Sequence, residues 1–217
     1  METKKTVLVW DLPTRVFHWA LAATIALAWI TAEADAIFFT LHIFFGEAVI
    51  ALVVFRLIWG VVGGRHARFT DFVRPLSAVS SYLRILFSRM PDHYRGHNPA
   101  AGWMVLALLM ISFLAAASGL FIAEDDFIGP FVEVVSLGDD LHEGLANLLL
   151  ILIFIHVPAA FLMSVLMGEN LIGAMWTGDK SRPQGDILSG QAPVTVPLWR
   201  ALLAALLAGF VALWPFL

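Results

Sequence analysis

Long apolar runs, almost free of charged residues, restrict this chain to a narrow set of folds. Four runs approach or exceed the ~20 residues that a helix needs to cross the hydrocarbon core of a membrane. They cover about residues 16–31, 42–62, 101–122 and 141–167. A fifth, at about 198–217, is less regular because Arg200 lies near its start. The pattern predicts an all-α integral membrane protein, a four-helix transmembrane bundle with a fifth C-terminal transmembrane helix.

The composition excludes several other classes of protein. Of the 217 residues, 60% are hydrophobic and only 14% are charged, against about 25% charged residues in soluble domains. A soluble monomer of this size could not bury so much apolar surface. The net charge of -4 argues against a nucleic-acid-binding surface. Because the chain has no cysteine, it has no disulfide, no cysteine-bound iron–sulfur cluster and no thiol chemistry.

The charged residues are sorted by side. Two loops expected on one side, at about 32–41 and 123–140, contain no Lys or Arg. They carry the acidic residues Glu33, Asp35, Glu124, Asp125, Asp126, Glu133, Asp139 and Asp140. The other side carries Lys4, Lys5, Arg15, Arg65, Arg68, Arg74, Arg84, Arg89, Arg95, Lys180, Arg182 and Arg200. The positive-inside rule therefore predicts a multi-pass membrane protein with a cytoplasmic N-terminus.

The connecting segments give further expectations. Residues 77–90 alternate apolar and polar side chains and predict an amphipathic helix on the membrane surface. Asn98 and Pro99 suit the N-cap and the first position of the third spanning helix. The Pro- and Gly-rich stretch 181–197 predicts a linker between a main domain, residues 1–180, and the last helix.

Four histidines lie within the spans, where ionisable side chains are costly and mark functional sites. They are His18, His42, His142 and His156. His156 follows His142 by 14 residues, which is about 21 Å along the helix and within about 40° of the same face. The depths predict two pairs, His42 with His142 and His18 with His156. Each pair could hold a haem iron from both axial sides; a proton or ion pathway is the alternative, and zinc is less favoured.

Other polar residues have two interpretations each. Arg56 lies on the face of His42 and nearer the cytoplasm, where it could pair with a haem propionate or a quinone carbonyl. It could equally extend to the membrane interface. Glu47 could carry protons for a quinone or form a hydrogen bond between helices. The remaining histidines, His66, His93 and His97, are expected to be solvated loop residues.

Four stretches of the chain resemble the bacterial cytochrome b561 family, which includes the b-type cytochrome subunits of nickel–iron hydrogenases. They are VWDLPTRVFHW within 7–19, LHIFFGEAVIALVVFRLIWG at 41–60, GHNP at 96–99 and LHEGLANLLLILIFIH at 141–156. The resemblance covers about residues 7–180. It implies a four-helix bundle with two haem b groups, held by His18, His42, His142 and His156, and electron exchange with quinone.

The resulting hypothesis is a di-haem cytochrome that carries electrons between a periplasmic partner and the quinone pool. The acidic loops favour a basic partner, such as a c-type cytochrome, and the basic side with Arg56 favours a cytoplasmic quinone site. The alternatives are a superoxide:ubiquinone oxidoreductase, the membrane anchor of a hydrogenase-like oxidoreductase, and a non-redox proton or ion transporter. Membrane lipid is an expected partner and nucleic acid is not, while association with a second copy is left open.

Overall fold

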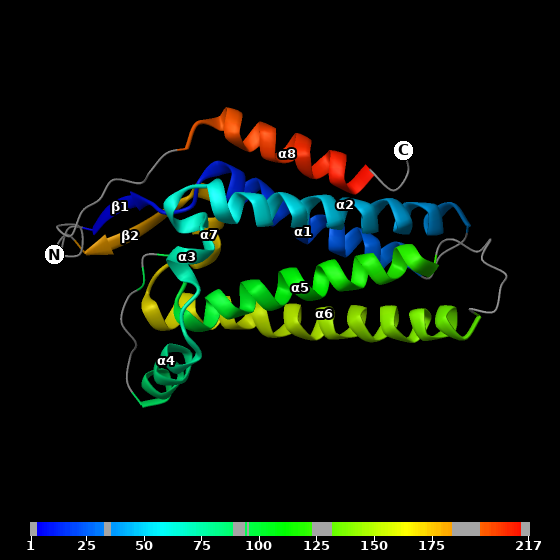
Figure 1. Ribbon diagram of the computed structural model, residues 1–217. Helices are drawn as coiled ribbons and strands as arrows, with labels where there is room; N and C mark the ends of the chain where they lie inside the picture. The colour runs from blue at the N-terminus through cyan, green and yellow to red at the C-terminus, as the bar shows by residue number, and fades with distance from the viewer. Residues whose placement is uncertain are drawn as a thin grey trace.

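Helices make up most of the protein in the computed structural model, which describes residues 4–32, 36–88, 94, 96–122, 132–183 and 196–213. Five long helices run lengthwise and side by side (Figure 1). They are α1 (Leu12–Thr31), α2 (Ala36–Val62), α5 (Pro99–Ile122), α6 (Val132–Met167) and α8 (Leu198–Leu213). α2 packs against α1, α5 and α8, and α5 packs against α6. α2 is therefore the central helix of the bundle.

The short elements gather at one end of the bundle, which we call the hairpin end (Figure 1). They are β1 (Lys4–Leu8), the 3₁₀ helix η1 (Arg65–Ala67), α3 (Phe69–Phe72), α4 (Leu76–Ser88), α7 (Leu171–Thr177) and β2 (Asp179–Pro183). α4 confirms the helix predicted at about 77–90. Tyr82 on it is buried, and its hydroxyl donates to the Met163 sulfur at 3.8 Å.

Within the described residues, three helices are long and apolar enough to cross a membrane: Ile37–Val62, Pro99–Leu120 and Gly138–Met167. Their outer faces are apolar and exposed, with Phe154 at 73% and Val61 at 70%. Exposed apolar surface of this extent is what a lipid environment covers. The described part of the chain is thus mostly helical, of the kind found in membranes, and includes one two-stranded sheet.

Two helices begin earlier than the hydropathy suggested. α2 starts at Ala36 instead of about residue 42, and α6 starts at Val132 instead of about 141. The prediction of a loop over 123–140 is therefore wrong from residue 132 onward, where the chain is helical. Charged residues such as Asp139 keep a helical stretch out of lipid but do not end the helix, because a helix ends at backbone breakers or caps.

The sheet joins distant parts of the chain. β1 and β2 are antiparallel, with Val7 opposite Lys180 and Leu8 opposite Asp179. The backbone N–H groups of Val9 and Trp10 donate to the Gly178 carbonyl at 2.8 and 3.0 Å. Gly178 has φ +91°, a left-handed conformation that ends α7 and suits glycine. β2 extends to Pro183, into the stretch expected as a linker.

Capping side chains set the helix starts near the hairpin end. Asp11 accepts from the Thr14 N–H at 2.9 Å, as an N-cap does. The same carboxylate accepts from the Trp59 indole N–H at 3.2 Å and the Gly64 N–H at 3.3 Å. It therefore joins the start of α1 to the end of α2. The predicted Asn98 cap is confirmed, since its Oδ1 accepts from the Ala101 N–H at 2.8 Å.

Candidate functional site

The His42 and His142 rings face each other at the end of the bundle opposite the hairpin end. His42 comes from α2 and His142 from α6, 100 positions apart in sequence. Their ring centroids are 6.0 Å apart and their planes are at 88°. The structure thus brings together the two residues that the depth argument paired.

Backbone carbonyls hold one nitrogen of each ring. His42 Nδ1 lies 2.8 Å from the Ala28 oxygen on α1, and His142 Nδ1 lies 2.8 Å from the Ala115 oxygen on α5. The Ser118 hydroxyl is a further neighbour of His142 Nδ1, at 3.3 Å. Because a carbonyl only accepts, each Nδ1 carries the proton and donates. The lone pair of each Nε2 is then available to a metal, the arrangement usual for ligating histidines.

The ring separation fits a metal ion held between two histidines. A nitrogen–metal distance of about 2 Å on each side places the centroids of two opposed imidazoles about 6 Å apart. Among the residues that the structure describes, no three His, Asp or Glu side chains gather around one point. The two-histidine set therefore suits a metal whose other ligands come from a macrocycle.

Glycines border this pair. A Cβ added at Gly119 on α5 would lie 2.9 Å from His142 Cε1 and 3.1 Å from its Nδ1, so the absence of a side chain lets the ring lie against α5. A Cβ at Gly46, one turn after His42, or at Gly144 would meet nothing within 4 Å. Gly46 shares the face of α2 with His42, and the open space there is compatible with a flat group beside that ring.

His18 and His156 lie toward the hairpin end, within electrostatic range of each other. The Nδ1 atom of His18 is buried and has no hydrogen-bond partner. Trp19 lies edge-on to His18 at 5.1 Å and stacks on Trp176 of α7 at 4.5 Å. The Trp19 indole also donates to the Met175 carbonyl at 3.1 Å. α7 therefore supports α1 next to His18.

His97 is not a solvated loop residue, and that expectation is wrong. Its ring centroid lies 4.7 Å from that of Trp10 and 4.6 Å from that of Phe72, and its Nδ1 atom is buried without a hydrogen-bond partner. Burial, reinforced by nearby cations, lowers the pKa of His97 to about 3. The aromatic rings that cover it come from other parts of the chain, so the local sequence gave no sign of them. The GHNP motif was the available signal.

The other two loop histidines differ. His66 Nδ1 lies 3.0 Å from Asp71 Oδ2; burial lowers the pKa of His66, and the Asp71 carboxylate partly opposes this. His66 is therefore partly buried and paired. His93 lies outside the described residues.

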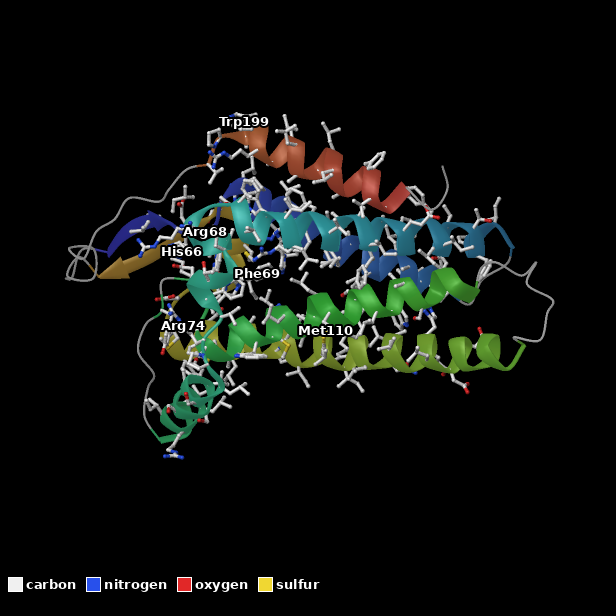
Figure 2. The ribbon with its side chains drawn as sticks, viewed as in Figure 1. His66, Arg68, Phe69, Arg74, Met110 and Trp199 are labelled. Atoms are coloured by element: carbon white, nitrogen blue, oxygen red, sulfur yellow. The ribbon has the colours of Figure 1, made fainter. Side chains whose placement is uncertain are left out.

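Arg56 is only 2% exposed, so its side chain does not reach the interface with water in this structure. Its guanidinium carbon lies 4.9 Å from the Phe69 ring centroid and 5.8 Å from that of Phe72. Figure 2 shows Phe69 and His66 at the hairpin end of the bundle. Arg56 thus belongs to the same end as His97, and one of its nitrogens, Nη1, is buried without a hydrogen-bond partner.

The structure describes only some of the acidic residues that the sequence placed on one side of the membrane. Asp139, Asp140 and Glu143 are exposed on α6, near the His42–His142 end. Glu47 is partly exposed. Glu33, Asp35, Glu124, Asp125 and Asp126 lie outside the described residues.

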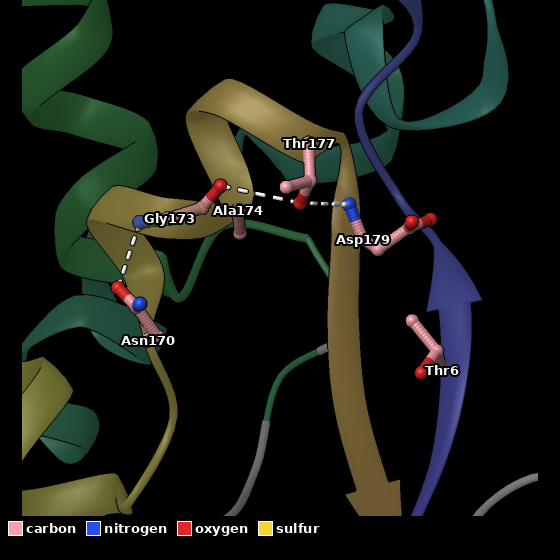
Figure 3. A pocket seen from close by; sticks show the side chains of 6 residues that line it. All are labelled: Thr6, Asn170, Gly173, Ala174, Thr177 and Asp179. Atoms are coloured by element: carbon pink, nitrogen blue, oxygen red, sulfur yellow. Dashed lines mark hydrogen bonds between the residues drawn. The ribbon is translucent and has the colours of Figure 1, made fainter.

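A surface pocket at the hairpin end is lined by β1, α7 and β2 residues (Figure 3). Its lining includes Thr6, Asn170 and Asp179 but none of the four histidines. It is separate from the site that the histidines form.

Sequence comparisons find bacterial relatives of this chain. Three bacterial relatives are each named "Probable Ni/Fe-hydrogenase B-type cytochrome subunit". The protein from Bradyrhizobium diazoefficiens is 22% identical, over 82% of this chain and 87% of its own length. The protein from Rhizobium leguminosarum bv. viciae is 22% identical, over 82% of this chain and 90% of its own length. The protein from Cupriavidus necator is 24% identical, over 80% of this chain and 86% of its own length.

No solved structure gives a significant match. The family profile described as prokaryotic cytochrome b561 matches residues 9–178, which include all four intramembrane histidines. The similarity and the apolar helices indicate a multi-pass bacterial membrane protein with haem b and a role in electron transfer. The chain belongs to the prokaryotic cytochrome b561 family.

Proposed function

We propose that this protein is a two-haem cytochrome that carries electrons across the membrane between a periplasmic redox partner and quinone. The observation that carries the proposal is the His42–His142 pair: two imidazoles 6.0 Å apart, each with Nδ1 held by a backbone carbonyl. Such a pair can ligate one iron from both sides. A haem b bound there supplies one-electron redox chemistry without an open coordination position.

The protein's own contribution at this site is orientation. The Ala28 and Ala115 carbonyls fix the tautomer of each histidine, which leaves the lone pair on Nε2 for a metal. The apolar faces of the helices keep water away, which favours electron transfer without side reactions. The surroundings of the two histidines differ, because the Ser118 hydroxyl lies near His142 Nδ1.

His18 and His156 are the ligands we propose for a second haem, nearer the hairpin end. Their mutual proximity supports this. Two haems at the two depths would form a relay across the bilayer. The positive-inside rule places the hairpin end in the cytoplasm, where we locate quinone reduction or oxidation. The acidic residues of the opposite end, of which Asp139 and Asp140 are exposed, would attract a basic partner such as a c-type cytochrome.

The assignment is tested by counting haems in histidine variants. The purified protein is expected to show a b-type reduced-minus-oxidised spectrum with two haems per chain. His142→Asn removes mainly one haem and His156→Asn mainly the other, with distinct midpoint potentials remaining. His66→Asn, a histidine outside both pairs, is the control and keeps both. A haem-free wild-type protein, or loss of the same haem in both variants, would contradict the proposal.

A second candidate function is that of a membrane subunit for a redox enzyme. The names of the three relatives favour it. In that case a partner enzyme would deliver electrons to the haems, in place of a diffusing cytochrome. Mild-detergent purification followed by mass spectrometry distinguishes the two, because a subunit co-purifies in fixed stoichiometry with its enzyme.

Two further readings have direct assays. Superoxide oxidation by quinone would appear as superoxide-driven quinone reduction, which the acidic outer residues disfavour for an anionic substrate. A non-redox proton or ion transporter would move protons or ions without bound haem. Neither outcome is expected.

A further inference from the structure

Positive charge is concentrated around His97 at the hairpin end. Arg56, His66, His156 and Lys180 all lie within electrostatic range of His97. Phe72 is a neighbour of both Arg56 and His97: its ring centroid lies 5.8 Å from the guanidinium carbon and 4.6 Å from the His97 centroid. The Trp10 ring lies 4.7 Å from the His97 ring and 5.8 Å from the Lys180 ammonium. These contacts define one compact polar cluster within an aromatic frame.

Arg56 has no adequate counter-charge in this cluster. Among the residues that the structure describes, no carboxylate lies within ion-pairing distance of its guanidinium. Asp11 is within electrostatic range, but its oxygens accept from the Thr14, Trp59 and Gly64 N–H groups. A charge that is 98% buried without a partner is costly, and so is the unpartnered Nη1. The site lacks an anion.

His97 lacks a hydrogen-bond acceptor at the same place. Its buried Nδ1 has no partner, and a buried polar nitrogen left unsatisfied costs roughly 1–3 kcal/mol. Lys180, by contrast, lies 3.8 Å from Glu169 Oε2, and its ammonium donates to the Gly96 carbonyl at 3.4 Å. Arg56 and His97 therefore each carry a buried nitrogen that has no partner among the described residues.

We propose that Arg56 and His97 bind the propionate carboxylates of the haem assigned to His18 and His156. This inference rests on the proposed function. A haem b carries two carboxylates, so it brings the missing anions and acceptors to the cluster. Arg56 supplies charge-assisted hydrogen bonds and His97 an N–H donor. His97 lies within electrostatic range of His156, the expected ligand, so the two donors and that ligand belong to the same end of the bundle.

The first test is a redox titration of three variants. Arg56→Gln removes the positive charge beside the propionates, so one haem becomes harder to reduce. We expect its reduction equilibrium constant to fall about tenfold, which is about 59 mV for a one-electron couple. The haem on His42 and His142 keeps its potential and reports that the fold is intact. Arg56→Lys retains the charge and most of the potential. Arg200→Gln, an exposed arginine at the start of α8, changes neither haem.

His97 is tested by the loss and return of a donor. His97→Phe keeps an aromatic ring between Trp10 and Phe72 but removes the N–H, so the same haem shifts in the same direction as in Arg56→Gln. His97→Asn places an amide N–H near the position of Nδ1 and restores most of the wild-type potential. Equal shifts in His97→Phe and His97→Asn would overturn the role assigned to this donor.

Isotope labelling identifies the anion itself. Haem with ¹³C-labelled propionates is incorporated, and redox-difference infrared spectra are recorded. Arg56→Gln should shift the labelled carboxylate bands, whereas a quinone or a free anion at Arg56 would leave those bands unchanged and so refute the inference. If the wild-type protein binds no haem, the proposed function fails instead. If both haems are present and the labelled bands are insensitive to Arg56 and His97, only the propionate assignment fails.

Discussion

Gly119→Ala is the substitution that tests the His42–His142 site most directly. The added Cβ would lie 2.9 Å from His142 Cε1 and 3.1 Å from Nδ1. Carbon atoms in ordinary contact are about 3.5–4.0 Å apart, so the imidazole must move by roughly 0.6 Å or more. The backbone of α5 cannot yield as easily as the ring, because it lies within a regular helix.

The displacement acts on the hydrogen bond that orients the ligand. His142 Nδ1 lies 2.8 Å from the Ala115 carbonyl, and a move of that size away from α5 lengthens the contact to about 3.4 Å, beyond the usual range. A hydrogen bond of this kind contributes about 0.5–1.5 kcal/mol. Replacing glycine by alanine in a helix favours folding by about 1 kcal/mol. Global stability should therefore change little while the haem site weakens by about three- to tenfold.

The assay is haem content per chain together with the midpoint potential of each haem. Gly119→Ala should lose or shift one haem and leave the other unchanged. Gly209→Ala on α8, where a new Cβ meets nothing within 4 Å, is the matched control and keeps both. Two unaltered haems in Gly119→Ala would refute the reasoning that His142 ligates from the position seen here.

Three further outcomes are expected. Ser118→Ala removes the hydroxyl 3.3 Å from His142 Nδ1; it should shift the potential of the His42–His142 haem alone, as measured by redox titration. Asp11→Ala removes the α1 cap and the acceptor for Trp59. It should lower the free energy of unfolding by about 1–3 kcal/mol, as measured by thermal unfolding in detergent. In the haem-free protein, His97 stays neutral down to about pH 3, whereas an unfolded chain protonates it near 6.5. The free energy of unfolding should therefore fall as the pH drops below 6.5, and His97→Asn should flatten this dependence between pH 7 and 5.

The sequence allowed the apolar helices to be predicted because long uncharged runs have few other uses. The same depth argument paired His42 with His142, which the structure brings together. It could not locate the start of α6, because residues 132–140 are polar enough for water and still helical. Local helix propensity is the same for a stretch in lipid and a stretch in water, so it does not show that one helix continues from lipid into water.

The hairpin end was the less predictable half. His97 is covered by Trp10 and Phe72, and Arg56 is covered by Phe69. These contacts depend on how α3 folds back against the end of α2, which no periodicity in the sequence records. The two strands were missed because each is only five residues long, and an isolated two-stranded pair has little stability of its own.

The pairing of β1 with β2 has a consequence for how the protein is made. Leu8 leaves the ribosome 171 residues before its partner Asp179, which at 5–20 residues per second is a wait of about 9–34 s. During that time Trp10 can cover His97, but Lys180 and Gly178 do not yet exist. The hairpin end is therefore completed only after α6 has been synthesised, and insertion of the helices precedes closure of the site that they carry.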